Sequence, residues 1–148
     1  MARVYVSAVM NATLEQAWGM LRDFGDLGNY HPFFENSYIE EDWPADRVGC
    51  VRRFSVREDG GYLRERLLEL SDRDYRCTYE ILHIDADWRN YVAQMQLFPV
   101  TETNQCFGQW WATFDVPAEQ EAQACQRVAD TFRIFFECVN QRFGDADE

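Results

Sequence analysis

Arg52 and Glu65 are two opposite charges that could together anchor a polar group of a ligand or take part in proton transfer. They stand in two runs of alternating side chains, residues 48–56 and 61–70, and the glycines between the runs suit a tight hairpin turn. Because every second residue of a hairpin faces the same side, both charges share one face of the predicted sheet. The other members of that face are apolar: Cys50, Phe54, Val56, Leu63 and Leu67.

The position of the turn determines how the two charges meet. A turn centred on Asp59 and Gly60 makes Arg52 and Glu65 diagonal neighbours on adjacent strands. It predicts the cross-strand pairs Arg52 with Leu67, Phe54 with Glu65, and Val56 with Leu63. Since burying either charge alone is costly, we expect a hydrogen-bonded Arg and carboxylate inside the sheet. Such a pair is either structural or a polar anchor for a ligand in a mostly apolar pocket.

The later strand-like runs add aromatic side chains to the same face. Alternation turns Tyr79, Tyr91 and Ala93 inward, and the phase of the last run favours Trp110 inward and Trp111 outward. Buried tyrosine hydroxyls need a hydrogen-bond partner, which can be protein, water or ligand. The two tyrosines are therefore either core residues at the end of a sheet or ligand contacts.

No motif for a metal or a covalent nucleophile accompanies these residues. His31 and His83 are the two histidines, and neither lies at metal-ligand spacing. The five cysteines are odd in number, lack C-x-x-C spacing and have no obvious basic partner, so we expect reduced, buried thiols. We therefore expect no metal and no cofactor. Catalysis by proton transfer requires neither a metal nor a covalent nucleophile. Glu65 or His31 could act as the base and a tyrosine such as Tyr91 as the proton donor, with a polyketone-like substrate.

These residues need a sheet and a helix to bring them together. The pattern predicts a strand over 3–9, a helix from the N-cap Thr13 to about Asp23 with Gln16 completing a capping box, and a helical turn over 26–30. Six strand-like runs follow, over residues 34–41, 48–56, 61–70, 75–82, 90–99 and 105–116, and then a long C-terminal helix. Without helical crossovers the sheet should be antiparallel, which gives an α+β domain over residues 1–148. The apolar stripe expected to face the sheet is Cys125, Val128, Phe132, Phe135, Phe136 and Val139.

Composition narrows the classes of partner. The chain has 26 acidic and 14 basic residues and a formal charge of −12, which repels phosphate backbones and anionic lipid, so we expect no nucleic-acid partner. No apolar run is long enough for a membrane span and no basic leader precedes an apolar segment. We expect a cytoplasmic protein without stable membrane insertion. An outward Trp111 would offer a homodimer contact.

A family resemblance rests on four short sequence motifs, which occur in this order: Val48-Gly49-Cys50-Val51-Arg52, Glu65-Arg66-Leu67, Asn90-Tyr91 and Ala129-Asp130-Thr131. The sequence resembles the START and Bet v 1-like (SRPBCC) superfamily over about residues 3–143, in particular the polyketide cyclase/dehydrase-like group that includes plant abscisic-acid receptors. The resemblance implies a helix-grip fold, in which a seven-stranded curved antiparallel sheet wraps around the C-terminal helix and encloses a ligand cavity.

The resemblance also implies site residues. Glu65 and Tyr91 fall where the receptors contact ligand through water, and His31 replaces a lysine that meets the ligand's carboxylate. The apolar wall positions implied are Phe54, Val56, Tyr79, Val128, Phe132 and Phe136. The receptors' gate is replaced by the short turn 58–61 and their latch by residues 86–88, so a hormone switch is not implied. Trp110 stands where a carboxylate would lie, which puts a preference for the same acid in doubt.

Three functions stay open at this point. The first is passive binding or transport of a small, largely apolar ligand, whether lipid-like, polyketide or aromatic. The second is a polyketide cyclase/dehydratase-type enzyme that uses proton transfer in the same cavity, and the third is an interaction module. Two loop aromatics, Trp43 and Trp88, would either serve a partner surface or cap the mouth of the pocket.

Overall fold

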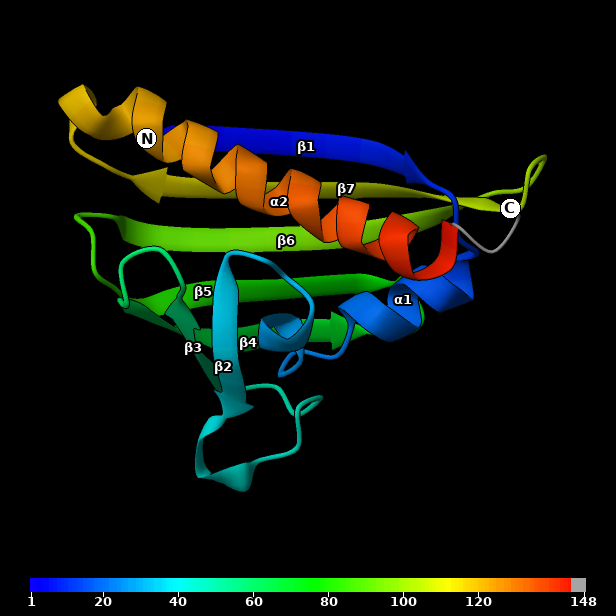
Figure 1. Cartoon of the computed structure of the whole chain (residues 1–148), viewed down its shortest axis with the longest axis horizontal. Coiled ribbons are helices and arrows are strands. Elements are labelled where there is room, and N and C mark those ends of the chain that lie inside the picture. Colours follow the sequence, from blue (N-terminus) through cyan, green and yellow to red (C-terminus); the bar gives the residue numbers. More distant parts are fainter. Residues whose placement is uncertain (145–148) are drawn as a thin grey trace.

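Seven antiparallel strands form one sheet in the computed structural model, which describes residues 1–144 (Figure 1). Their order across the sheet is β1-β7-β6-β5-β4-β3-β2, so the first strand pairs with the last. The bounds are β1 Ala2–Met10, β2 Phe34–Ile39, β3 Val51–Val56, β4 Tyr62–Ser71, β5 Arg76–Ile84, β6 Arg89–Val100 and β7 Gln105–Asp115. The predicted antiparallel sheet is confirmed, with strand ends that differ by a few residues.

Two α-helices and three short 3-10 helices complete the fold of residues 1–144. They are α1 Leu14–Leu21, η1 Leu27–Asn29, η2 Glu40–Asp42, η3 Ala118–Gln120 and α2 Glu121–Phe143. Thr13 caps α1 and Gln16 completes the capping box, as predicted, although the helix ends at Leu21 rather than near Asp23. No helix within residues 1–144 is both long and apolar enough to cross a membrane. The predicted domain bounds reach residue 148, and the last four residues lie outside the described part.

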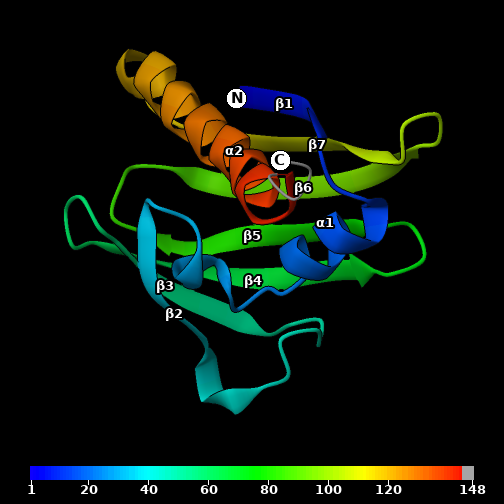
Figure 2. The same cartoon turned by 45° about the vertical axis from the view of Figure 1, so that its right-hand side comes forward.

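Helix α2 covers the concave face of the sheet. Figures 1 and 2 show it running in front of β1, β7 and β6, while α1 lies at one end of the sheet. Its buried side chains are Ala124, Val128, Phe132, Phe135, Phe136, Cys138 and Val139. The predicted stripe is confirmed except at Cys125, which is half-buried. A curved sheet closed by a long C-terminal helix is the helix-grip arrangement.

The register of the β3–β4 hairpin differs from the predicted one by two residues. Arg52 pairs directly with Glu65, and Phe54 pairs with Leu63. The turn is one position earlier than expected because the Gly60 N–H donates to the Val56 carbonyl, and Gly60 adopts a φ of 73° that favours glycine. A shift by two leaves every side chain on its predicted face, so both charges still point inward.

Two bulges bend β4 and β5 where they pass the charged pair. The register shifts between Arg64 and Glu65, and again between Leu67 and Glu69. Bulges increase local twist and bend the strand that carries them. The bend curves this part of the sheet around the space in front of Glu65.

Gly108 allows α2 to approach β7 closely. A Cβ atom there would lie 2.6 Å from Cε1 of Phe136 and 2.8 Å from Cε of Met10. We therefore expect Gly108→Ala to lower the free energy of unfolding by about 1–3 kcal/mol, measured by urea denaturation. A Cβ atom at Gly19 of α1 would have no atom within 4 Å. Gly19→Ala should therefore raise the free energy of unfolding by about 0.5–1 kcal/mol. Wild-type stability of Gly108→Ala would refute the close packing described here.

Candidate functional site

The buried pair of Arg52 and Glu65 forms the polar corner of the site. Both residues are 5% exposed. The guanidinium donates from Nε to Oε1 of Glu65 at 2.7 Å, and its Nη2 forms an ion pair with the same carboxylate oxygen at 2.7 Å. A third donor, Nη1, bonds the carbonyl of Phe24 at 3.2 Å and ties the loop after α1 to the sheet. The predicted burial and pairing of these charges are confirmed, as direct rather than diagonal neighbours.

Aromatic rings enclose the guanidinium of Arg52. Its Cζ lies 4.0 Å from the ring centroid of Phe24 and 4.7 Å from that of Tyr79. Burial raises the pKa of the Glu65 carboxyl above its usual range, while the adjacent Arg52 guanidinium opposes that rise. The corner therefore holds a permanent cation beside a carboxyl group whose proton affinity is increased.

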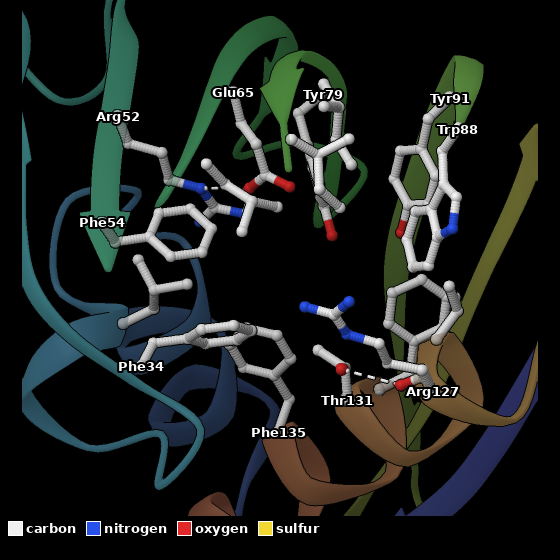
Figure 3. A pocket seen from close by; sticks show the side chains of 16 residues that line it. Phe34, Arg52, Phe54, Glu65, Tyr79, Trp88, Tyr91, Arg127, Thr131 and Phe135 are labelled. Carbon is white, nitrogen blue, oxygen red and sulfur yellow. Dashed lines mark hydrogen bonds and ion pairs between the residues drawn. The ribbon is translucent and has the colours of Figure 1, made fainter. Parts of the chain in front are cut away.

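An inner cavity opens in front of this pair (Figure 3). Its volume is about 40 Å³, which is enough for a few waters or for the tip of a larger molecule. Its polar lining comes from Arg52, Glu65, Tyr79, Tyr91, Arg127 and Thr131. Its apolar lining comes from Leu27, Phe34, Phe54, Leu63, Ile81, Ile84, Trp88, Val128, Phe132 and Phe135.

Three polar groups that face the inner cavity keep hydrogen-bonding capacity that a ligand could use. Both contacts of Arg52 with Glu65 are made to Oε1, which leaves Oε2 free, and no fully buried side-chain oxygen in the described residues lacks a partner. The Tyr79 hydroxyl accepts from Nε1 of Trp110 at 3.1 Å and keeps its own proton to donate. Burial raises the pKa of Tyr91 well above its usual value, so its hydroxyl stays protonated. Figure 3 shows both hydroxyls turned toward the cavity.

A larger, open groove adjoins the inner cavity. It lies between the β3–β4 turn and α2 and has a volume of about 570 Å³. Phe34, Arg127 and Thr131 line both spaces, and we call the boundary that they form between the two spaces the passage. The rest of this outer groove is lined by Pro32, Phe33, Val56, Arg57, Glu58, Gln123, Gln126 and Asp130.

Most predicted ligand positions line one of these spaces. The inner cavity includes Arg52, Phe54, Leu63, Glu65, Tyr79, Tyr91, Val128 and Phe132, whereas Val56 lines the outer groove instead. Three predicted wall residues lie outside the wall: Ala93, Trp110 and Phe136. The reason is the Trp110 indole, which reaches across β6 to Tyr79 and stacks on Phe132 and Phe135. It fills the space over Ala93, and Phe136 lies on its far side above Gly108.

His31 also lies outside the cavity wall, which corrects its predicted position as a ligand contact or base. It is 1% exposed and packs between Phe34 and Phe135, with ring centroids 4.7 and 4.5 Å away. Its Nδ1 accepts from the Phe33 N–H at 3.2 Å, so Nε2 carries the proton and donates to the Thr131 carbonyl at 3.1 Å. With both nitrogens engaged, His31 links the segment before β2 to α2.

Arg127 and Trp88 are lining residues that the sequence indicated weakly or not at all. Arg127 is exposed on the polar side of α2. A charged residue at such a position is normally expected to be solvated and not to line a cavity. Trp88 was expected either at a partner surface or over the pocket mouth, and it lines the inner cavity, stacked on Tyr91. Trp43 instead packs under Arg47, away from both spaces. Among residues 1–144, no group of His, Cys, Asp and Glu side chains could hold a metal ion.

The fold and site together correspond to a known class of protein. A family model described as "Polyketide cyclase / dehydrase and lipid transport" matches residues 1–142. The chain belongs to this family, which is of the SRPBCC type predicted from the sequence. A search of curated proteins finds no match.

Solved structures of the same fold come from several bacteria. The protein XoxI from Bacillus cereus superposes with a TM-score of 0.86 at 24% identity, covering 100% of this chain and 99% of that one. An uncharacterized protein from Bacillus thuringiensis gives 0.83 at 24% identity, with 97% and 100% covered. A protein from Thermobifida fusca gives 0.84 at 22% identity, with 97% and 94% covered. At these identities the likeness shows the fold.

His31 should make the stability of the fold depend on pH. Burial lowers its pKa from 6.5 to about 4, so the unfolded chain binds a proton between these values that the folded chain does not. His31 therefore makes its full contribution to the free energy of unfolding above pH 6.5. Between pH 6.5 and pH 4 this contribution falls by up to about 3 kcal/mol. Urea denaturation of wild type and His31→Gln should show the wild type losing more stability over this interval. Equal losses of stability in the wild type and His31→Gln would show that His31 is not the cause of the pH dependence. The control is His83→Gln, at the half-exposed histidine, which should behave as the wild type.

Proposed function

We propose that the protein binds a small, largely apolar molecule whose body lies in the outer groove and whose tip enters the inner cavity. The observation that carries the proposal is Oε2 of Glu65, a carboxylate oxygen that faces the cavity without a protein partner. A buried acceptor of this kind favours a ligand that brings a hydroxyl or amine donor. The surrounding aliphatic and aromatic walls favour a hydrocarbon or aromatic body.

The sizes of the two spaces support this division of the ligand. The outer groove has the volume typical of small-molecule sites, roughly 300–1,000 Å³, whereas the inner cavity admits only a small group. Arg127 stands at the passage between them and forms no ion pair with another described residue. The family description, which includes lipid transport, agrees with a lipid-like, polyketide or aromatic ligand.

A neutral fluorescent probe tests the proposal. N-phenyl-1-naphthylamine is apolar, carries one N–H donor and brightens when it leaves water, so it should bind the wild-type protein saturably. Val128→Phe places a ring inside the cavity wall and should weaken the probe's affinity at least about tenfold. The same change on the outer sheet face, Val92→Phe, should leave the affinity within about twofold.

Two further observations complete this test. Circular dichroism melts report whether Val128→Phe folds, and Thr131→Phe, at the half-buried mouth of the cavity, provides a second obstructing variant if it does not. Native mass spectrometry of protein purified from cells should also show a bound small molecule. Saturable probe binding that neither obstructing variant weakens would contradict the proposed site, and the absence of any probe binding to the wild type would contradict the function.

A second candidate function is proton-transfer catalysis in the same cavity, of the polyketide cyclase/dehydratase type. The observation that favours it is the grouping of Glu65 Oε2, whose carboxyl pKa is raised by burial, with two protonated tyrosine hydroxyls. The carboxylate would take a proton from the carbon between two carbonyl groups of a linear polyketone. The hydroxyl of Tyr91 would then hydrogen-bond the enolate oxygen that forms.

Turnover of a linear poly-β-ketone separates the two functions. If the protein is an enzyme, Tyr91→Phe should slow the reaction about 10²–10⁴-fold, because it removes one hydroxyl and retains the ion pair. Glu65→Gln should abolish turnover, with a melt recorded beside it because the change leaves Arg52 buried without a counter-charge. Wild-type rates in both variants would exclude this chemistry, and binding without turnover would leave the passive function.

A further inference from the structure

Arg127 is a cation that faces the cavity without an acidic partner in the described chain. It lines the inner cavity, the outer groove and a smaller pocket beside Trp88. Figure 3 shows its guanidinium pointing into the inner cavity toward the hydroxyl of Tyr79. The ion pairs of α2 join Arg133 to Asp130 and to Glu137, and none includes Arg127.

The indole of Trp88 supports the side chain of Arg127 from one side. The guanidinium carbon lies 5.4 Å from the ring centroid, within the range of a cation–π contact. This contact holds the planar guanidinium at the passage, where its N–H groups remain able to donate. An arginine presents paired donors that match the two oxygens of a carboxylate.

The other charges around the passage do not satisfy Arg127. In the outer groove, Arg57 bonds Glu35, and Asp130 accepts from Gln126 and Arg133. Glu58 lies in the exposed β3–β4 turn at the rim and forms no ion pair with another described residue. In the inner cavity, both bonds to Glu65 come from Arg52. The passage therefore has a free donor group at Arg127 and a free acceptor deeper inside at Glu65.

We infer that the ligand is an amphipathic acid whose carboxylate binds Arg127 at the passage, while its donor-bearing tip enters the inner cavity and its apolar body lies along the outer groove. The inference rests on the proposed binding function and adds the chemical class of the ligand. A chain with a net charge of −12 repels anions over most of its surface, so selectivity for an acid must come from a local cation. The opposite orientation, with the carboxylate beside Glu65, is disfavoured by repulsion between like charges.

A matched pair of ligands tests the inference: decanoic acid and 1-decanol, which differ only in the head group. Displacement of N-phenyl-1-naphthylamine gives the affinity of each at pH 7.5. The wild type should prefer the acid, and Arg127→Met should weaken acid binding roughly 10- to 100-fold while the affinity for the alcohol stays within about threefold. Arg127→Lys should restore part of the acid affinity because it keeps the charge without the planar pair of donors.

Arg142 provides the matched control. It is an exposed arginine in the last turn of the same helix, outside both spaces, so Arg142→Met changes the net charge equally and should leave both affinities unchanged. If Arg127→Met weakens acid and alcohol equally, or neither, the carboxylate site is wrong while the proposed binding function stands. If the wild type binds neither ligand nor the probe, the proposed function fails, and the acid site fails with it.

Discussion

The buried ion pair between Arg52 and Glu65 determines the charge and the geometry of the whole site. Two charges taken out of water must satisfy each other, and removing one partner of such a pair costs about 3–5 kcal/mol because the other stays buried. Replacing both by apolar residues is often neutral, so a buried pair adds little net stability. The pair instead fixes the position of the Glu65 carboxylate, with one of its oxygens toward the cavity. The bond from Arg52 to the Phe24 carbonyl in turn holds the guanidinium in place.

The rest of the molecule divides the surroundings of that oxygen into a small enclosed space and a large open one. Trp110 closes the inner cavity at the back by bonding Tyr79 and stacking on α2, and for this reason the cavity is small. Phe34, Arg127 and Thr131 form the passage to the outer groove. A ligand that uses both spaces needs a donor at its tip and an apolar body, and Arg127 adds a preference for an acid at the mouth. This division agrees with membership of a family described by polyketide and lipid chemistry.

The faces of the strands could be predicted from the sequence because alternation depends on the nature of each side chain. The register of the β3–β4 hairpin could not, since a shift by two residues preserves every face and only the backbone of Gly60 fixes the turn. The position of His31 depends on two backbone partners, Phe33 and Thr131, which no side-chain pattern reveals. The place of Arg127 in the cavity wall could not be predicted for a related reason. On a helix, an arginine at a cavity mouth and an arginine in solvent have the same spacing.

The most direct test of the account is the carboxyl resonance of Glu65, observed by carbon-13 NMR in glutamate-labelled protein during titration with 1-decanol. The resonance is assigned by its loss in Glu65→Gln. If Glu65 anchors the ligand, the resonance moves on binding, saturates at the same dissociation constant as probe displacement, and does so while the half-buried Glu80 carboxyl, paired with Arg66, stays unchanged. A Glu65 resonance that remains fixed at saturating ligand would contradict the claim that this carboxylate anchors the bound molecule.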